Sequence, residues 1–189
     1  MVQSIVIKRQ TGFTLVELLI VAIILAILAA IVVPQFASTT TDAEESALRA
    51  NLSAIRGAID LYRQQHGEYP TFLAATGAVC TGTPGGGLVN TQQALEEQLS
   101  RYTDNDGKSC SVGGVNAPFG PYIKDSVIPA NPVTGDNTVV IVKTGDAGSG
   151  DLELGPDVGS AGWKFDNVSG KFFANDDQND SQGVPFADY

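Results

Sequence analysis

Histidine is almost absent from this chain, since His66 is the only one among 189 residues. A metal centre built from several histidines is therefore excluded, and a Ser-His-Asp or Cys-His arrangement has a single candidate base. His66 ends a helical pattern and precedes Gly67, so its better interpretation is a partly charged imidazole near the carbonyl-rich end of a helix. We predict that the chain is not an enzyme.

Basic residues are also scarce. The chain has 11 Lys and Arg against 21 Asp and Glu, a net charge of −10, and the part after residue 36 keeps only nine basic residues against twenty acidic ones. So acidic a domain repels phosphate backbones, and a nucleic-acid partner is not expected. The stretch Gly82–Gly87 lacks the Gly-Lys-Ser/Thr ending of a phosphate loop, and we expect it to be flexible surface.

One long apolar run stands out against this acidic background. Phe13 to Val33 is 21 residues, which as a helix would measure roughly 31 Å, close to the hydrocarbon thickness of a bilayer. Glu17 lies one turn inside it, where an ionised group costs on the order of 2.5–3.5 kcal/mol. No basic residue follows until Arg49. The available positive charge is the amine that cleavage after Gly12 would create.

Around this carboxylate the chain resembles the type IV prepilins and the pseudopilins of type II secretion. In that family a peptidase cuts between Gly and Phe and methylates the new amine, and the acid pairs with the N-terminus of a neighbouring subunit. The resemblance implies cleavage at Gly12, N-methylation of Phe13 and an assembly role for Glu17. It covers residues 8 to about 70, and its motif reads Lys8-Arg9-Gln10-Thr11-Gly12-Phe13-Thr14-Leu15-Val16-Glu17.

The resemblance also implies the partners and location of the protein. The expected partners are copies of itself in a filament, other pilin or pseudopilin subunits, the prepilin peptidase and an inner-membrane assembly platform. The implied function is that of a structural subunit of a type IV pilus-like filament or of a type II secretion pseudopilus. We expect a single-pass inner-membrane protein before assembly and a periplasmic or extracellular filament afterwards, because basic residues before a span stay in the cytoplasm.

Two other interpretations of the N-terminus remain open. A secretory signal has a shorter apolar region followed by a small-x-small cleavage site, whereas the best candidate here, Ala37, has Gln35 two residues before it. A plain signal anchor would tolerate the length but would gain nothing from Glu17. An anchored extracytoplasmic binding module that does not polymerise is therefore the alternative function.

The hydrophobic pattern predicts an α+β, pilin-like fold. A long N-terminal helix, membrane-spanning in its first half and amphipathic in its second, is expected to pack on a C-terminal antiparallel β-sheet. The predicted apolar stripe is Leu48, Leu52, Ile55, Ile59 and Tyr62. We predict a leader over 1–12, an assembly helix over 13–36 and one globular domain over 37–189. Within the globular domain we expect a short helix at 91–99 and a hairpin loop at 166–170. The expected strands are 122–124, 138–142, 163–165 and 171–173.

The two cysteines, Cys80 and Cys110, lie in the part assigned to the oxidising side of the membrane, where disulfides persist. We predict that they are bonded to each other. Two buried free thiols are the alternative.

An acidic tail is the remaining candidate site. Asp176, Asp177 and Asp180, with two asparagines between and beside them, supply oxygen-bearing side chains of the kind that Ca²⁺ prefers. Major pseudopilins bind calcium in a C-terminal loop, although the loop of that family does not map residue by residue onto this tail. Calcium is thus a possible cofactor, and a solvated, partly disordered tail is the alternative. The stretch Asp104–Gly107 is expected to be a surface turn.

Overall fold

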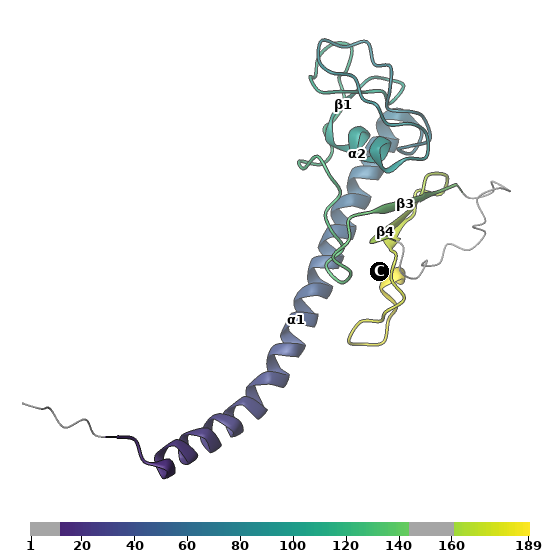
Figure 1. Cartoon of the computed structure of the whole chain (residues 1–189). Helices are drawn as coiled ribbons and strands as arrows, with labels where there is room; N and C mark the ends of the chain where they lie inside the picture. Colours follow the sequence, from purple (N-terminus) through teal and green to yellow (C-terminus); the bar gives the residue numbers. More distant parts are fainter. Residues whose placement is uncertain (1–11, 144–160) are drawn as a thin grey trace, which may run out of the picture. The chain divides into compact units, whose positions relative to one another are not determined.

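The computed structural model describes residues 12–143 and 161–189, apart from the side chains of residues 33–40. The chain divides into two units, residues 1–41 and 42–189, and helix α1 (Leu15–His66) contributes to both (Figure 1). In the first unit Leu15–Val32 is exposed on every side and has a mean hydropathy of 3.2, so it is long and apolar enough to cross a membrane.

In the second unit α1 buries a single stripe of side chains. The five predicted residues are all 2 % exposed or less, and they pack in one core with side chains from the short helix α2 (Gln92–Ser100) and from the C-terminal strands. Full burial of one large apolar side chain stabilises a fold by about 1.5–3 kcal/mol. The partners of the stripe include Leu95, Leu99, Trp163, Phe165 and Phe172.

The end of α1 and the start of α2 lie at the boundaries predicted from the sequence. Gly67 adopts a left-handed φ of +81° and donates its N–H to the carbonyl of Arg63 at 2.8 Å, which closes the last turn of α1. Thr91 caps α2, because its hydroxyl accepts the N–H of Ala94. The predictions for these two boundaries are confirmed.

The main sheet has the order β3 (Val139–Val142), β4 (Trp163–Asp166), β5 (Phe172–Ala174). Strands β4 and β5 form the expected hairpin, closed by Gly170 at φ +78°. The α+β class is confirmed, but β3 and β4 run parallel where an antiparallel sheet was expected. The physical reason is the long connection over 143–162, which has enough residues for a crossover back to the same end of the sheet.

A second, two-stranded sheet was not predicted. Strands β1 (Tyr102–Thr103) and β2 (Ser109–Cys110) are antiparallel, and the turn at 104–107 joins them. The strand predicted at 122–124 is wrong. The N–H groups of Tyr122 and Ile123 both donate to the carbonyl of Leu99, at 2.8 and 3.0 Å, so this segment satisfies the open end of α2 and does not join a sheet. A 3₁₀ turn, η1 (Phe186–Asp188), lies near the end of the chain.

Candidate processing and assembly site

The junction predicted for cleavage lies just outside α1. Gly12 and Phe13 precede the first helical residue, and the side chain of Phe13 is 76 % exposed. A Cβ atom added at Gly12 would meet nothing within 4 Å. The peptide bond between the two residues is therefore non-helical and accessible. The basic residues of the motif, Lys8 and Arg9, lie outside the described residues.

Glu17 takes part in a capping box at the start of α1. Its Oε2 accepts the backbone N–H of Thr14 at 2.9 Å and the Thr14 hydroxyl at 2.7 Å, while the Glu17 N–H donates to Thr14 Oγ1 at 3.2 Å. This reciprocal arrangement satisfies two of the free N–H groups of a helix start. The capping role of Thr14 was not predicted, although the spacing Thr-x-x-Glu before an apolar run is a sequence signal for a capping box. None of the ion pairs among the described residues involves Glu17.

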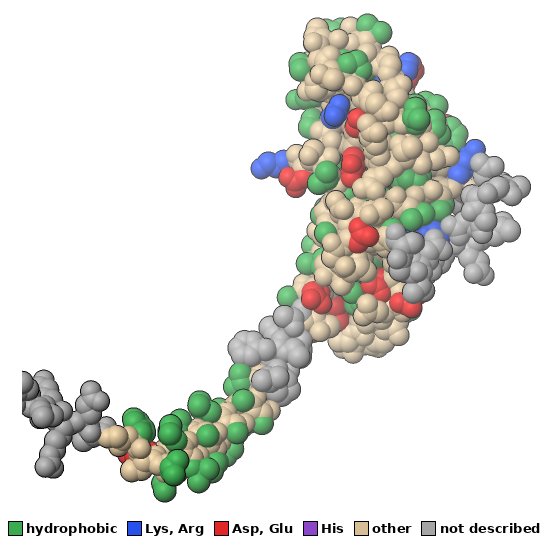
Figure 2. All heavy atoms as spheres, viewed as in Figure 1, with side chains coloured by type: hydrophobic (Ala, Val, Ile, Leu, Met, Phe, Trp, Pro, Cys, Tyr) green, Lys and Arg blue, Asp and Glu red, His purple; other side chains and the backbone are tan. Residues whose placement is uncertain are grey.

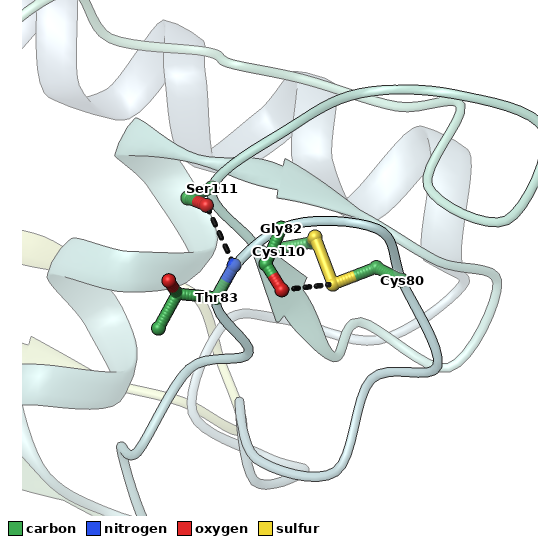
Figure 3. The surroundings of a disulfide bond; sticks show 5 residues. All are labelled: Cys80, Gly82, Thr83, Cys110 and Ser111. Carbon is green, nitrogen blue, oxygen red and sulfur yellow. Dashed lines mark hydrogen bonds between the residues drawn. A yellow bond between two sulfur atoms is a disulfide. The ribbon is translucent and has the colours of Figure 1, made fainter.

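Cys80 and Cys110 form a disulfide, with their Cα atoms 6.3 Å apart (Figure 3). The prediction of this bond is confirmed. Two further bonds run beside it: the Thr83 N–H donates to Ser111 Oγ at 2.8 Å, and the Ser111 N–H donates to the Thr83 carbonyl at 3.0 Å. The disulfide thus fastens the loop after α1 to strand β2.

The glycine-rich stretch is packed and is not the flexible surface that we expected. Glu97 Oε2 on α2 accepts the N–H groups of Gly86 and Gly87 at 2.8 and 2.9 Å. A Cβ atom on Gly87 would lie 2.4 Å from the backbone of Ala94. The glycines are therefore needed for close approach to α2. Composition does not distinguish such a loop from a mobile one, because both favour glycine.

His66 joins three segments of the domain. Its Nε2 lies 3.0 Å from both the Thr103 hydroxyl and the Tyr122 hydroxyl, and its ring lies 4.2 Å from that of Tyr62. Burial lowers the pKa of the imidazole. The neutral form is therefore favoured, in place of the partly charged form expected at a helix end, and the residue serves packing between α1, β1 and the segment around Tyr122.

This burial predicts a pH dependence of folding. Because the folded pKa of His66 is lowered, the unfolded chain binds more protons, so stability is fully present above the unfolded pKa of about 6.5 and is lost as pH falls through it towards the folded pKa. The free energy of unfolding of residues 42–189, from urea titrations between pH 8 and 5, is expected to fall over this range. His66→Gln should flatten the profile, and an unchanged slope in that variant would contradict the assignment.

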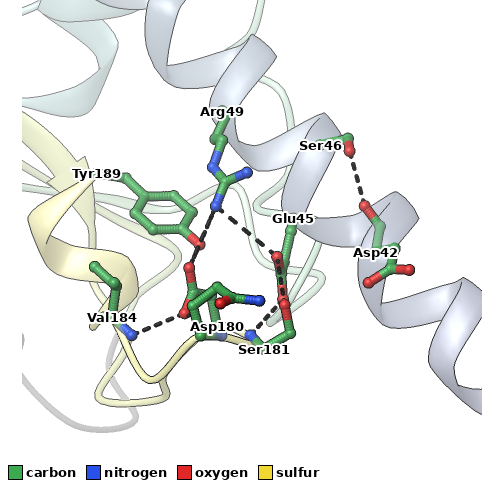
Figure 4. A network of polar contacts seen from close by, with 9 residues as sticks. Asp42, Glu45, Ser46, Arg49, Asp180, Ser181, Val184 and Tyr189 are labelled. Carbon is green, nitrogen blue, oxygen red and sulfur yellow. Dashed lines mark hydrogen bonds and ion pairs between the residues drawn. The ribbon is translucent and has the colours of Figure 1, made fainter.

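The acidic tail is partly folded against α1 (Figure 4). Asp180 is 8 % exposed: its Oδ1 accepts the N–H groups of Gln182 and Val184, and its Oδ2 accepts Arg49 at 3.3 Å and the Tyr189 hydroxyl. The Tyr189 hydrogen bond is the main cause of the lowered pKa of Asp180. This part of the tail is therefore packed against α1 and is not a solvated segment.

The other two predicted calcium ligands differ from each other in burial. Asp176 is 5 % exposed; its Oδ1 accepts the Gln178 N–H at 2.7 Å, and its Oδ2 is buried without a hydrogen-bond partner. Asp177 is exposed. Within residues 12–143 and 161–189, no three His, Cys, Asp or Glu side chains are grouped as a metal would need.

An exposed Gly12–Phe13 junction before a capped apolar helix, followed by an α+β domain, is the arrangement expected of a prepilin-type protein. Residues 7–33 match the family model described as the prokaryotic N-terminal methylation motif. The chain belongs to the family of the type II secretion system core protein G, the major pseudopilin. It is 30% identical over 151 residues to that protein from Klebsiella pneumoniae, covering 79% of this chain and 87% of the relative.

Two further relatives bear the same name. The protein from Vibrio cholerae is 29% identical over 151 residues, with 79% of this chain and 83% of the relative covered. The protein from Pseudomonas aeruginosa is 34% identical over 98 residues, with 52% and 56% covered. No solved structure gave a significant match.

Proposed function

We propose that this chain is a structural subunit of a type II secretion pseudopilus. Prepilin peptidase cuts it after Gly12 and methylates the new amine of Phe13. The mature helix spans the inner membrane before assembly. At an assembly platform it then packs against the helices of other copies and of other pseudopilins, and the packed subunits form a periplasmic filament. We assign no catalytic step to the chain.

The observation that carries the proposal is the placement of the methylation motif. The motif matches residues 7–33, and its cleavage junction is accessible immediately before an apolar helix. Lipid and a core of packed apolar helices are similar environments, so transfer between them costs little once the charge of Glu17 is neutralised. The amine freed at Phe13 of a neighbouring copy supplies that neutralising charge.

Mass spectrometry of the protein purified from native membranes tests the proposal. We expect an N-terminus at Phe13 that carries one added methyl group. A matched variant, Gly12→Val, should keep the full-length mass because a β-branched side chain stands at the scissile bond. An intact N-terminus in the native chain, or one near residue 38, would exclude processing as a prepilin.

For the acidic tail we propose calcium binding through Asp176, with Asp177 or Asp180 as further ligands. The support is the buried, unpartnered Oδ2 of Asp176 in a stretch rich in oxygen ligands. The melting temperature of residues 42–189 should then be higher in calcium than in chelator, and Asp176→Asn should abolish the difference. Equal melting temperatures would exclude calcium binding by the tail. The Arg49–Asp180 ion pair would then be the interaction that attaches the tail to α1.

A further inference from the structure

Charged residues are segregated along the part of α1 that belongs to the globular unit. Three acids lie within residues 42–45, and three arginines follow at positions 49, 56 and 63, with Asp60 between the last two. The seven-residue spacing brings the arginines close to one face of the helix, because seven residues make almost two full turns. In Figure 2 acidic side chains gather at the end of the domain where α1 begins to pack on it. This part of the helix thus has an acidic beginning and a mainly basic continuation.

Two of the three arginines are engaged by groups of their own chain. The guanidinium of Arg49 pairs with Asp180 at 3.3 Å and lies over the ring of Tyr189 (Figure 4). Arg63 lies over the ring of Tyr69, with its Cζ 4.3 Å from the ring centroid. These contacts fix both side chains against the domain.

Arg56 lacks such a partner for its charge. It is half-buried and donates its Nε–H to the carbonyl of Phe172 at 2.8 Å, but none of the ion pairs among the described residues involves it. Burial lowers the pKa of its guanidinium, as expected of a charge partly removed from water without a compensating carboxylate. The two terminal amino groups remain able to bind a carboxylate in the two-pronged geometry that arginine favours.

Arg56 lies where two hollows on the surface of the domain meet. One, of about 490 Å³, is lined by α1 and by residues 169–173, and the other, of about 540 Å³, runs beside α1. Arg56, Asp60 and Tyr189 line both, and we call the two hollows together the arginine groove. Asp60 and Asp188 also line it, but both are exposed and solvated by water. The charge in the groove that is shielded from water and uncompensated is therefore the guanidinium.

We propose that the arginine groove receives Glu44 of a second copy of this chain, an inference that rests on the proposed function as a filament subunit. In a head-to-tail contact two different patches of one chain meet, so each copy must carry both of them. Glu44 is exposed, and none of the ion pairs among the described residues involves it. It precedes Arg56 by roughly 18 Å along the helix and about 120° around it. Parallel helices displaced by this distance bring the carboxylate level with the guanidinium.

Charge argues for a second copy as the occupant. The part of the chain after residue 36 has nine basic residues against twenty acidic ones, so two copies repel each other unless their contact joins opposite charges. Of the nine, Lys164 is buried, and Arg101 and Lys108 are paired with acids of their own chain. Parallel copies in register would also place acids against acids and arginines against arginines. The segregation of charge along α1 therefore favours a displaced contact through the groove.

An exchange of charges tests the proposal in cells in which the variant is the only copy. Arg56→Glu and Glu44→Arg should each lower the share of subunit in filament fractions by about tenfold, because each places like charges face to face. The double variant should return most of the yield, since opposite charges then meet in exchanged positions. The control Glu68→Arg makes the same change of charge at an exposed site outside the groove, and it should assemble normally.

Glu44→Arg keeps this test independent of folding, since Glu44 is exposed whereas Arg56 holds the carbonyl of Phe172. Normal yield from Glu44→Arg, or a double variant that assembles no better than Arg56→Glu, would overturn the pairing while the proposed function stands. Absence of filaments from the unaltered chain would overturn the proposed function and the pairing with it. The two failures are therefore distinguishable.

A photo-crosslinker locates the contact directly. Ser53 is exposed and lines the groove beside Arg56. A benzophenone amino acid at position 53 of the full chain should give an adduct of two copies whose link maps to residues 42–49 of the second copy. The same probe at the exposed Asp177 should not link to these residues. A link from position 53 to any other part of the second copy, or adducts with other proteins alone, would overturn the assignment of Glu44.

Discussion

Replacing Glu17 by glutamine is expected to reduce incorporation into filaments at least about tenfold while processing and membrane insertion continue. The substitution removes the charge that we propose pairs with the Phe13 amine of a neighbouring copy, and it keeps the apolar span. An unpaired amine in an apolar filament core costs several kcal/mol, and each 1.4 kcal/mol is a factor of ten. The measurement is the amount of subunit in filament fractions released from the periplasm, relative to total subunit, with the variant as the only copy.

The capping box provides the control for this experiment. Glutamine retains the capping interaction with Thr14, so Glu17→Gln removes charge alone. Thr14→Ala breaks the hydroxyl bonds of the cap and keeps the charge, and it should assemble nearly normally. Normal filament yield from Glu17→Gln would refute the assembly role of the carboxylate and would favour an anchored binding module. Failure of Thr14→Ala alone would instead assign the defect to the helix start.

Removing the disulfide is expected to have the largest effect on the stability of the domain. Cys80 and Cys110 are 30 positions apart, and closing a loop of this length stabilises a fold by about 3–4 kcal/mol in the chain-entropy model. The double variant Cys80→Ser, Cys110→Ser should lower the free energy of unfolding of residues 42–189 by that amount, measured by urea titration.

A neighbouring variant separates the covalent bond from its surroundings. Ser111→Ala removes the hydrogen bond to the Thr83 N–H and should cost only about 1 kcal/mol. The oxidised chain should also yield one trypsin fragment in which residues 64–101 and 109–124 remain linked until reductant is added. If reduction left the unfolding curve of the native domain unchanged, the loop would owe its order to packing alone.

The sequence predicted those parts of the fold that depend on local periodicity. The stripe of α1, the boundaries at Gly67 and Thr91, and the hairpin closed by Gly170 follow from spacing and from the preferences of single residues. The parallel pairing of β3 and β4 depends on the path of a long connection, which spacing does not encode. Tyr122 and Ile123 fit a strand pattern, but the free carbonyl of Leu99 decided their conformation.

In the candidate site, too, residues of one local motif were predictable from the sequence, whereas contacts between distant residues were not. Gly12, Phe13 and Glu17 lie within one short motif, so their roles are predicted from the sequence alone and stay predictions. The contacts of Glu97 with the glycine loop and of Asp180 with Arg49 join residues distant in the chain, and only the structure brings them together. Acidic composition alone therefore does not predict the ion pair between Arg49 and Asp180.

The core of the domain also has a consequence for the order of events during synthesis. Arg56 on α1 donates to the carbonyl of Phe172, a residue 116 positions later, and the apolar stripe of the same helix packs on β4 and β5. At ordinary rates of translation these strands emerge on the order of ten seconds after the helix. Until then the stripe is a bare apolar surface of the kind that chaperones bind and that aggregates form around. The apolar stripe of the first helix is therefore buried only after the final strands have been synthesised, and until then the nascent chain can aggregate through it.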